Sequence, residues 1–381
     1  MNNLLVLIAF MLLTACTGKP EKKAAPVMVY QEELEWQPVA VAFNDRTEDG
    51  FRLEKALPSG YVKDGSEDYT AFIQQAIVNH DRIIFPAFPL KINEIGLRIP
   101  SDKTIIFPKG SELRLAATDK GKYAIIDIRN ARNVELVGPV VVGDRDKHIG
   151  SGGEWGMGIN IVSSENVRVY NARVTKCWGD GIYVAGSSER GPSRNIRIVN
   201  AYCRDNRRNG ISVISADGLD LISPYSGYNE GIDPQCGIDI EPNKPGDRIR
   251  NIRIVDARTE YNPGAGISIG INKLYGSGDQ QVSVDIRKPV DYGSMDGFLI
   301  SCSASRSKNG EKVSGTITVT DPVWKYNPKT SLSVHKLREP ALKVRVLNAA
   351  VTDPQGKKIA EDAFHQQVRA TLRTPEQVAL K

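Results

Sequence analysis

A four-residue phrase recurs through the middle of the chain and constrains its fold more than any other feature. Each copy reads Gly-Ile, then a polar residue, then Ile or Val. The copies are Gly158–Ile161, Gly181–Val184, Gly210–Val213, Gly237–Ile240 and Gly266–Ile269. Their starting positions differ by 23, 29, 27 and 29 residues. A period of roughly 20–50 residues is typical of solenoids and other repeat arrays.

A second alternating phrase is interleaved with the first. Its copies are Asn133–Leu136, Asn166–Val169, Asn195–Ile198, Gly218–Leu221 and Asn251–Ile254. Both phrases alternate apolar and polar residues, as a strand with one buried face does. Such short strands cannot bury their apolar face alone, so successive coils must stack to complete a core. The sequence therefore predicts an all-β parallel β-helix, with equivalent residues roughly 4.8 Å apart.

The regions on either side of the repeats are expected to close the β-helix within a domain of residues 45–355. A helix over residues 68–79, with one apolar face, would cover the first coil and its unpaired backbone groups. Residues 315–320 and 342–347 still alternate and are expected to form terminal coils or a small β cap. In residues 356–381 the apolar pattern thins, and we expect a short helix or a frayed tail.

The N-terminus has the features of a targeting segment. Residues 1–15 carry no charge, and Leu4–Leu13 is wholly apolar, which is too short to span a bilayer but typical of a signal peptide. Leu13–Cys16 resembles the lipobox of bacterial lipoproteins, which implies cleavage before Cys16 and lipidation of that cysteine. Simple secretion or an uncleaved apolar N-terminus are the alternatives. Residues 16–44 are expected to be a tether that holds an extracytoplasmic lipoprotein at a membrane.

Charge and cysteine usage restrict the partners. Fifty Lys and Arg against 45 Asp and Glu give a net charge of +5 without a long basic block, so no nucleic-acid partner is predicted. An anionic substrate remains open. Four cysteines are expected to be buried thiols in different coils, with one disulfide as the alternative: Cys177, Cys203, Cys236 and Cys302. No metal or cofactor is predicted, although acidic residues leave calcium open.

Three runs near the N-terminus resemble a known signature. They are residues 64–70 (DGSEDYT), 73–77 (IQQAI) and 83–86 (IIFP). Their order is similar to the N-terminal signature of the pectate-lyase/glycosyl-hydrolase-28-like superfamily of right-handed parallel β-helix proteins. Together with the coils, this resemblance covers about residues 45–350. It implies a right-handed solenoid that acts on polysaccharides as a hydrolase, lyase or epimerase, or that only binds glycans.

The outward residues of the first phrase form the candidate functional surface. Because the Ile and Val side chains point inward, the polar residue between them points outward. This places Asp239 on an outward stripe, and Glu241 lies on the same face with its α-carbon roughly 6.6 Å away. Cleavage of a glycosidic bond needs a proton donor and a base or nucleophile. Repulsion between the two carboxylates would also raise one pKa. We therefore predict Asp239 and Glu241 as catalytic, with a solvated acidic surface as the alternative.

Further residues near this stripe are candidates. Asp180, two coils upstream, is predicted to assist the catalytic pair, although Asp-Gly is also a common turn. Trp178 is expected to stack on a sugar ring, and paired arginines could clamp a carboxylate or sulfate. The predicted substrate-binding residues are Trp178, Tyr183, Arg207, Arg208, Glu154, Trp155 and Asn160.

The sequence thus predicts an extracytoplasmic enzyme that cleaves glycosidic bonds by carboxylate chemistry in a groove along the β-helix. A lyase or epimerase acting on a uronate polymer is the first alternative, in which an Arg or Lys would remove a proton from the sugar. A non-catalytic glycan-binding β-helix is the second alternative. The outward stripe carries serines and an asparagine as well as carboxylates, and this composition favours the binding protein.

Overall fold

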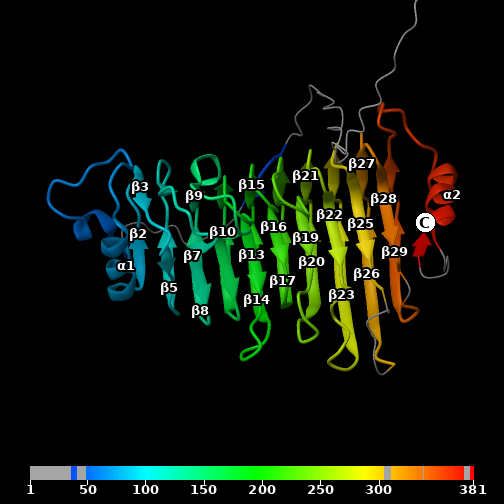
Figure 1. Ribbon diagram of the computed structural model, residues 1–381, viewed down its shortest axis with the longest axis horizontal. Helices are drawn as coiled ribbons and strands as arrows, with labels where there is room; N and C mark the ends of the chain where they lie inside the picture. Colours follow the sequence, from blue (N-terminus) through cyan, green and yellow to red (C-terminus); the bar gives the residue numbers. More distant parts are fainter. Residues whose placement is uncertain (1–35, 41–48, 304–309, 338, 373–377) are drawn as a thin grey trace, which may run out of the picture. The chain divides into compact units, whose positions relative to one another are not determined.

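The computed structural model describes residues 36–40, 49–303, 310–337, 339–372 and 378–381. Within the compact unit Trp36–Lys381, the chain forms the predicted right-handed parallel β-helix (Figure 1). Each coil adds one strand to each of three parallel sheets, which we name A, B and C. Among the described residues, these sheets contain twelve, ten and nine strands.

Sheet A contains the second phrase. Its strands, in spatial order, are β1 (Phe51–Arg52), β2 (Arg82–Ile84), β5 (Lys103–Ile106), β8 (Arg132–Val137), β11 (Glu165–Tyr170), β14 (Ser193–Val199), β17 (Ala216–Ile222), β20 (Ile249–Val255), β23 (Gln280–Arg287), β26 (Val313–Thr320), β29 (Leu342–Leu347) and β31 (Val378–Leu380).

Sheet B follows sheet A in each coil. Its strands are β3 (Pro89–Ile92), β6 (Glu112–Leu115), β9 (Val140–Val142), β12 (Arg173–Thr175), β15 (Tyr202–Arg204), β18 (Tyr225–Gly227), β21 (Arg258–Glu260), β24 (Val290–Tyr292), β27 (Val323–Lys325) and β30 (Ala350–Val351).

Sheet C contains the first phrase. Its strands are β4 (Leu97–Arg98), β7 (Lys122–Arg129), β10 (Trp155–Val162), β13 (Ile182–Ala185), β16 (Ile211–Val213), β19 (Ile238–Ile240), β22 (Ala265–Gly270), β25 (Asp296–Ser301) and β28 (Thr330–His335). Short helical turns cover Leu53–Ala56 (η2) and Arg145–Lys147 (η3).

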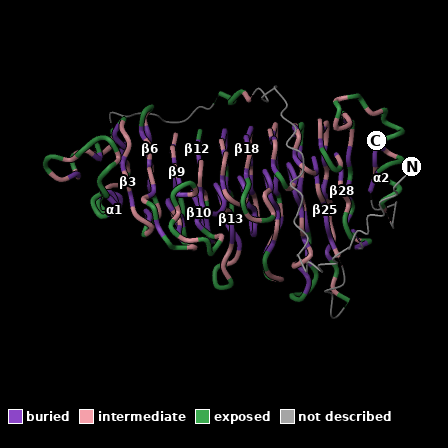
Figure 2. The backbone as a smooth tube through the Cα atoms, turned by 45° about the horizontal axis from the view of Figure 1, so that its top comes forward, coloured by how far each residue is buried: buried purple, intermediate pink, exposed green. Residues whose placement is uncertain are grey.

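The core is a set of aliphatic columns that run through the coils. In sheet C the first isoleucine of every phrase pairs with its equivalent in the next coil, and all are buried: Ile159, Ile182, Ile211, Ile238 and Ile267. Figure 2 shows this buried interior along the whole solenoid. Burying a side chain of this size stabilises a fold by about 1.5–3 kcal/mol, so the stacked columns supply most of the cohesion.

Asparagine begins the second phrase because the backbone there turns into the left-handed region. Asn133, Asn166, Asn195 and Asn251 have φ values of 55°, 55°, 50° and 52°, and Gly218 takes the same place with φ 86°. Asparagine and glycine accept this conformation more readily than other residues. The amide of Asn166 also donates to Asn133 at 3.2 Å, which links successive turns.

Helices and strands close both ends of the solenoid, as predicted. Helix α1 (Thr70–Asn79) buries Ile73 and Ile77 against the first coils. Residues 315–320 and 342–347 belong to β26 and β29, which are terminal coils. Helix α2 (Glu361–Thr371) follows. The expectation of a frayed tail is wrong for Val378–Leu380, which pairs with β29 as an additional strand.

The N-terminal part of the unit differs from the expected tether. Trp36 donates through its indole nitrogen to the carbonyl of Ser223 at 3.1 Å. Val39 exchanges two hydrogen bonds with the side chain of Asn200, at 2.9 and 2.8 Å. Residues 36–40 therefore pack on the β-helix and are not part of a free linker. The predicted leader, lipidated Cys16 and remaining tether lie outside the described residues.

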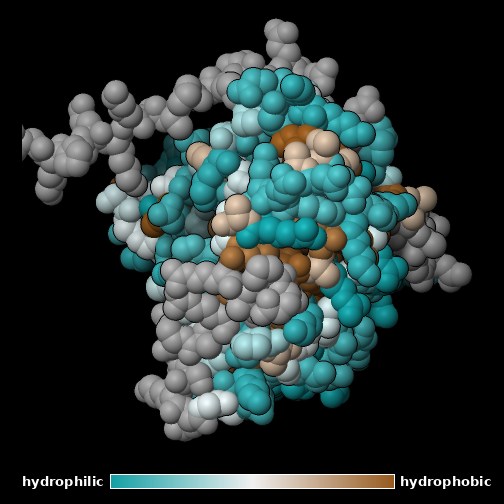
Figure 3. Space-filling model, turned by 90° about the vertical axis from the view of Figure 1, so that its right-hand side faces the viewer, coloured by the Kyte–Doolittle hydropathy of each residue, from teal (hydrophilic) through white to brown (hydrophobic). Residues whose placement is uncertain are grey.

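The cysteines follow the sequence-based expectation. Cys177, Cys203, Cys236 and Cys302 are all buried free thiols. On the face that Figure 3 shows, hydrophilic side chains predominate and apolar ones form small groups. Of the helices in the described ranges, none is both long and apolar enough to cross a membrane.

The glycine of the first phrase is expected to be required by backbone packing. A Cβ on Gly158 would lie 2.3 Å from Val174 Cγ1 and 2.6 Å from the carbonyl oxygen of Gly181. We predict that Gly158→Ala lowers the free energy of unfolding by about 1–3 kcal/mol, as overpacking does. Gly246→Ala is the control, because a Cβ there meets no atom within 4 Å. Urea denaturation that gives both variants the same midpoint would contradict this prediction.

Candidate functional site

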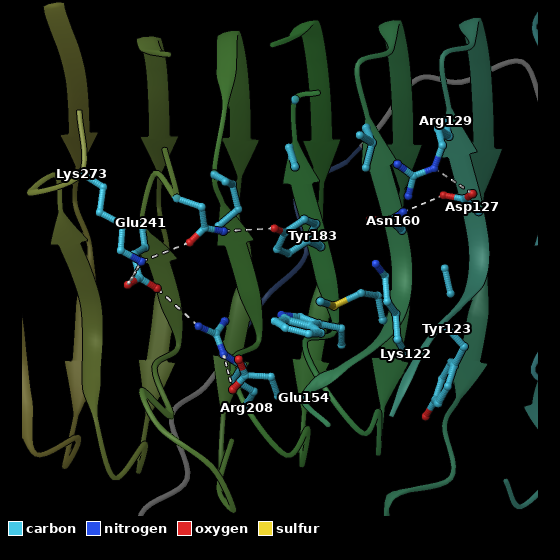
Figure 4. A pocket seen from close by; sticks show the side chains of 18 residues that line it. Lys122, Tyr123, Asp127, Arg129, Glu154, Asn160, Tyr183, Arg208, Glu241 and Lys273 are labelled. Carbon is cyan, nitrogen blue, oxygen red and sulfur yellow. Dashed lines mark hydrogen bonds and ion pairs between the residues drawn. The ribbon is translucent and has the colours of Figure 1, made fainter. Parts of the chain in front are cut away.

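A groove of about 940 Å³ crosses the outward face of sheet C (Figure 4). Its floor comes from β7, β10 and β13, and its far end from the turns that follow β16, β19 and β22. The outward stripe beneath it stays in register from coil to coil, as predicted. The paired residues are Asp127, Asn160, Tyr183, Ser212, Asp239 and Ser268.

A second, smaller cavity of about 210 Å³ lies on the same face, over β19, β22 and β25. Asp239 lines only this small cavity, whereas Arg208 lines only the large groove. Glu241 and Lys273 line both cavities and form an ion pair at 3.8 Å. The two cavities therefore adjoin at this pair.

Arg208 holds the predicted carboxylates together. Its guanidinium donates to Asp180 at 3.2 Å and to Glu241 at 3.3 Å. The neighbouring Asn209 also connects two carboxylates, because its backbone N–H donates to Asp180 at 3.1 Å and its amide to Asp239 at 3.3 Å. The structure thus brings the three predicted acidic residues into one cluster, although Asp180 lies two coils before Asp239 and Glu241.

The three carboxylates of this cluster have different environments. Asp180 is fully buried and lines neither cavity. Burial raises its pKa, while Arg208 acts in the opposite direction. Asp180 therefore positions Arg208 and does not reach a ligand directly. The assisting role that the sequence analysis gave to Asp180 stays a prediction, and in this geometry Asp180 can exert it through Arg208 and Asn209.

Asp239 and Glu241 both line the small cavity, although Asp239 itself is only 2% exposed. Burial and the charge of Glu241 together raise the pKa of Asp239 to about 7. The side chain of Glu241 is 30% exposed and pairs with both Arg208 and Lys273. A buried acid that holds its proton near neutrality thus lies beside an exposed carboxylate with two cationic partners.

Five of the predicted substrate-binding residues line the large groove: Glu154, Trp155, Asn160, Tyr183 and Arg208. Trp155 is 50% exposed, so its ring is open to a ligand. Asn160 donates to Asp127 at 2.6 Å. Burial raises the pKa of Tyr183 to about 12, so its hydroxyl stays protonated and can donate a hydrogen bond.

Trp178 and Arg207 are placed differently from the prediction. The Trp178 ring is 8% exposed and stacks on His148 with 3.7 Å between ring centroids. The Arg207 guanidinium lies 3.8 Å from the same ring and donates to the carbonyl of Gly153 at 2.8 Å. Little of the indole is left for a sugar, and neither residue lines the groove. Both residues instead pack against the residues beside the groove.

Sequence reasoning missed several lining residues. Asp127 and Arg129 lie on β7 and form an ion pair at 3.3 Å in the groove. Their strand alternates apolar and polar residues, so extending the stripe by one coil would have found them, although it lacks the Gly-Ile phrase. Lys273 follows β22 in a turn, where no periodic pattern indicates the direction of a side chain.

The carboxylate cluster is organised around a guanidinium. Throughout the described ranges, no group of three or more His, Cys, Asp or Glu side chains has an arrangement that could hold a metal ion. Arg208 occupies the centre of the cluster, and its side chain is 12% exposed. Carboxyl groups beside a guanidinium can transfer protons to a ligand and form hydrogen bonds with it.

We expect Arg208→Met to be strongly destabilising, because it leaves buried carboxylates without their cation. Removing one partner of a buried ion pair costs about 3–5 kcal/mol. The matched control is Arg197→Met. Arg197 pairs with Asp220 on the outer face of sheet A and is 45% exposed, and exposed pairs contribute about 0–1 kcal/mol. Thermal and urea unfolding of both variants measure the difference, and equal losses of stability would contradict the central role of Arg208.

No family model matches the chain. Two curated proteins of Bacillus subtilis (strain 168) are similar in sequence. The uncharacterized protein YclG is 27% identical over 287 residues, which cover 62% of this chain and 49% of that protein. The SPbeta prophage-derived uncharacterized protein YorA is 28% identical over 163 residues, which cover 38% of this chain and 28% of that protein. The chain spans at most about half the length of these relatives.

Several solved structures share the fold at low sequence identity. The tailspike protein of E. coli bacteriophage HK620, solved with a pentasaccharide, has a TM-score of 0.61 at 11% identity and covers 81% of this chain and 58% of that one. The Streptococcus pneumoniae surface adhesin PfbA has a TM-score of 0.59 at 12% identity, with coverages of 80% and 79%. The A-module of the Azotobacter vinelandii mannuronan C-5 epimerase AlgE4 has a TM-score of 0.51 at 12% identity, with coverages of 81% and 79%. These similarities identify the chain as a parallel β-helix.

Proposed function

We propose that this protein is a glycoside hydrolase that cleaves a polysaccharide in the groove on sheet C. Asp239 is the proton donor and Glu241 is the base or nucleophile. The observation that carries the proposal is the buried carboxyl of Asp239, with its pKa raised to about 7, beside the half-buried carboxyl of Glu241 where the two cavities adjoin. Glycosidic cleavage requires two carboxyl groups in these contrasting states.

Each group has a defined task in this reaction. Asp239 transfers its proton to the glycosidic oxygen as the bond from that oxygen to the anomeric carbon breaks. Glu241 faces the positive charge that develops on the sugar ring and provides the base or nucleophile. Arg208 and Lys273 orient the Glu241 carboxylate, at 3.3 and 3.8 Å. Asp180 acts only as a positioning residue, through Arg208 and Asn209.

The charges of the groove favour a largely neutral glycan over a uronate polymer. The lining contains four basic residues (Lys122, Arg129, Arg208, Lys273) and three acidic ones (Asp127, Glu154, Glu241). Arg129 is paired with Asp127, and Arg208 and Lys273 with Glu241. A uronate polymer brings one carboxylate per sugar and would meet three carboxylates beside the four cations. This balance supports hydrolysis over elimination or epimerisation, in which a uronate carboxylate must be neutralised.

The lining of the groove also suits sugar rings. The exposed ring of Trp155 offers an apolar face for stacking, the task that the sequence analysis gave to Trp178. Tyr183, Asn160 and Asn243 supply hydroxyl and amide groups along the floor. The shared fold adds support, since the HK620 tailspike was solved with a pentasaccharide and AlgE4 is named as a mannuronan epimerase.

We further propose that the hydrolase works outside the cytoplasm and is held at a membrane through lipidated Cys16. The support is the uncharged, apolar segment of residues 1–15 and its lipobox-like ending. Mass spectrometry of the protein purified from membranes tests this proposal. The expected result is a diacylglycerol adduct at an N-terminal Cys16, and an unmodified Cys16 would contradict it.

We expect Asp239→Asn and Glu241→Gln each to lower kcat by about 10²–10⁴-fold, the contribution of a positioned acid or base. Asp285→Asn is the control, because Asp285 lies on sheet A and pairs with Arg287. The assay measures new reducing ends released from a panel of neutral and acidic polysaccharides. Because Asp239 must carry its proton, the activity of the unmodified enzyme should also fall as the pH rises above about 7.

Other outcomes of this assay distinguish the alternatives. Absorbance from an unsaturated uronate would indicate a lyase and contradict hydrolysis. Glycan binding without any new reducing end or double bond would indicate a binding protein. Full activity of Asp239→Asn in a correctly folded variant would refute the assignment of the proton donor.

A further inference from the structure

The small cavity exists because three neighbouring outward positions carry little or no side chain. These are Ser268 and Gly270 on β22, and Ser301 on β25. Asp239 on β19 is the registered partner of Ser268 in the previous coil. A Cβ on Gly270 would make an ordinary van der Waals contact with Ser301 Oγ at 3.6 Å, so a side chain can begin there without a clash.

Larger side chains lie on two sides of the small outward residues. Toward the large groove stands the ion pair of Glu241 and Lys273. In the opposite direction, the register places Leu299 next to Ser268 and His335 next to Ser301. Registered partners in parallel strands point to the same face. Leu299 on β25 and His335 on β28 are therefore bulkier outward residues beside the small ones.

The dimensions and chemistry of the small cavity fit a single sugar ring. Its volume of about 210 Å³ is below the roughly 300–1,000 Å³ typical of sites for drug-sized ligands. The large groove, at about 940 Å³, has room for several sugars. Ser268, Asn272 and Ser301 offer hydroxyl and amide groups to sugar hydroxyls. Asn272 donates to Ser301 at 3.0 Å, which fixes the orientation of both.

We propose that the small cavity is the subsite for the terminal sugar, so that the enzyme removes one sugar at a time from a chain end. This inference rests on the proposed hydrolase function. The polymer lies along the large groove and its terminal ring occupies the small cavity. The glycosidic bond that joins this ring to the rest of the polymer lies next to Glu241. Asp239 protonates the glycosidic oxygen and that C–O bond breaks. The oxygen of water then forms the new bond to the anomeric carbon, and the water gives up its proton to a carboxylate.

The test is a time course of product lengths. Amylose, xylan, mannan and galactan, together with oligosaccharides prepared from them, are the probes, and mass spectrometry and viscometry are the readouts. We expect monosaccharide as the first product, while the viscosity of the polymer stays nearly constant. The Gly270→Trp variant fills the small cavity and should lower kcat/KM at least about tenfold. The Gly246→Trp control lies outside both cavities, where a Cβ meets no atom within 4 Å, and should keep the activity.

Product inhibition gives a second readout that does not depend on turnover alone. The released monosaccharide should inhibit the unmodified enzyme competitively and should inhibit Gly270→Trp much less. Early release of many chain lengths with a rapid fall in viscosity would overturn the inference but leave the hydrolase proposal intact. No cleavage of any of these glycans would contradict the hydrolase proposal and this inference with it.

Discussion

The in-register stacking of parallel coils is the constraint on which the rest of the structure depends. Each outward residue lies above its equivalent in the previous coil, at a spacing of roughly 4.8 Å. Residues that are about 30 positions apart in sequence therefore become direct neighbours. Asp180, Arg208 and Glu241 come from three successive coils and meet only because the aliphatic columns fix the register.

Stacking alone would place negatively charged carboxylates close together. The positive charge of Arg208 offsets their repulsion. Its guanidinium connects Asp180 and Glu241, while Asn209 beside it connects Asp180 to Asp239. Asp239 has no ion pair of its own in this arrangement, and burial raises its pKa. The same arrangement therefore stabilises the fold and separates the roles of the two accessible carboxyl groups. Protonated and ionised forms can coexist near neutral pH only because their surroundings differ.

The sequence predicted the fold and the shared face of Asp239 and Glu241, because both depend on strand periodicity, while the catalytic role of the pair stays a prediction. The alternation that gave the aliphatic columns also places Asp239 and Glu241 on one face. Turn residues were harder to predict, because their direction depends on neighbouring coils. Trp178 lies against His148 and Arg207, contacts that no local pattern indicates. Lys273 was missed for the same reason.

Two segments near the ends of the described part of the chain show the same limit of local sequence patterns. Residues 36–40 have the composition of a linker, yet Trp36 and Val39 find partners on the distant coils of Ser223 and Asn200. Val378–Leu380 is short and follows a helix, and only the exposed edge of β29 makes it a strand. Tertiary contacts decide both segments, so their local sequence is uninformative.

A crystal structure of the Asp239→Asn variant, soaked with a neutral oligosaccharide that the unmodified enzyme cleaves, tests the central claim most directly. The account predicts a sugar chain along sheet C, with one ring over Ser268 and Ser301 and a glycosidic oxygen within hydrogen-bonding distance of residue 239. A sugar chain bound along sheet A or sheet B, remote from Glu241, would contradict it.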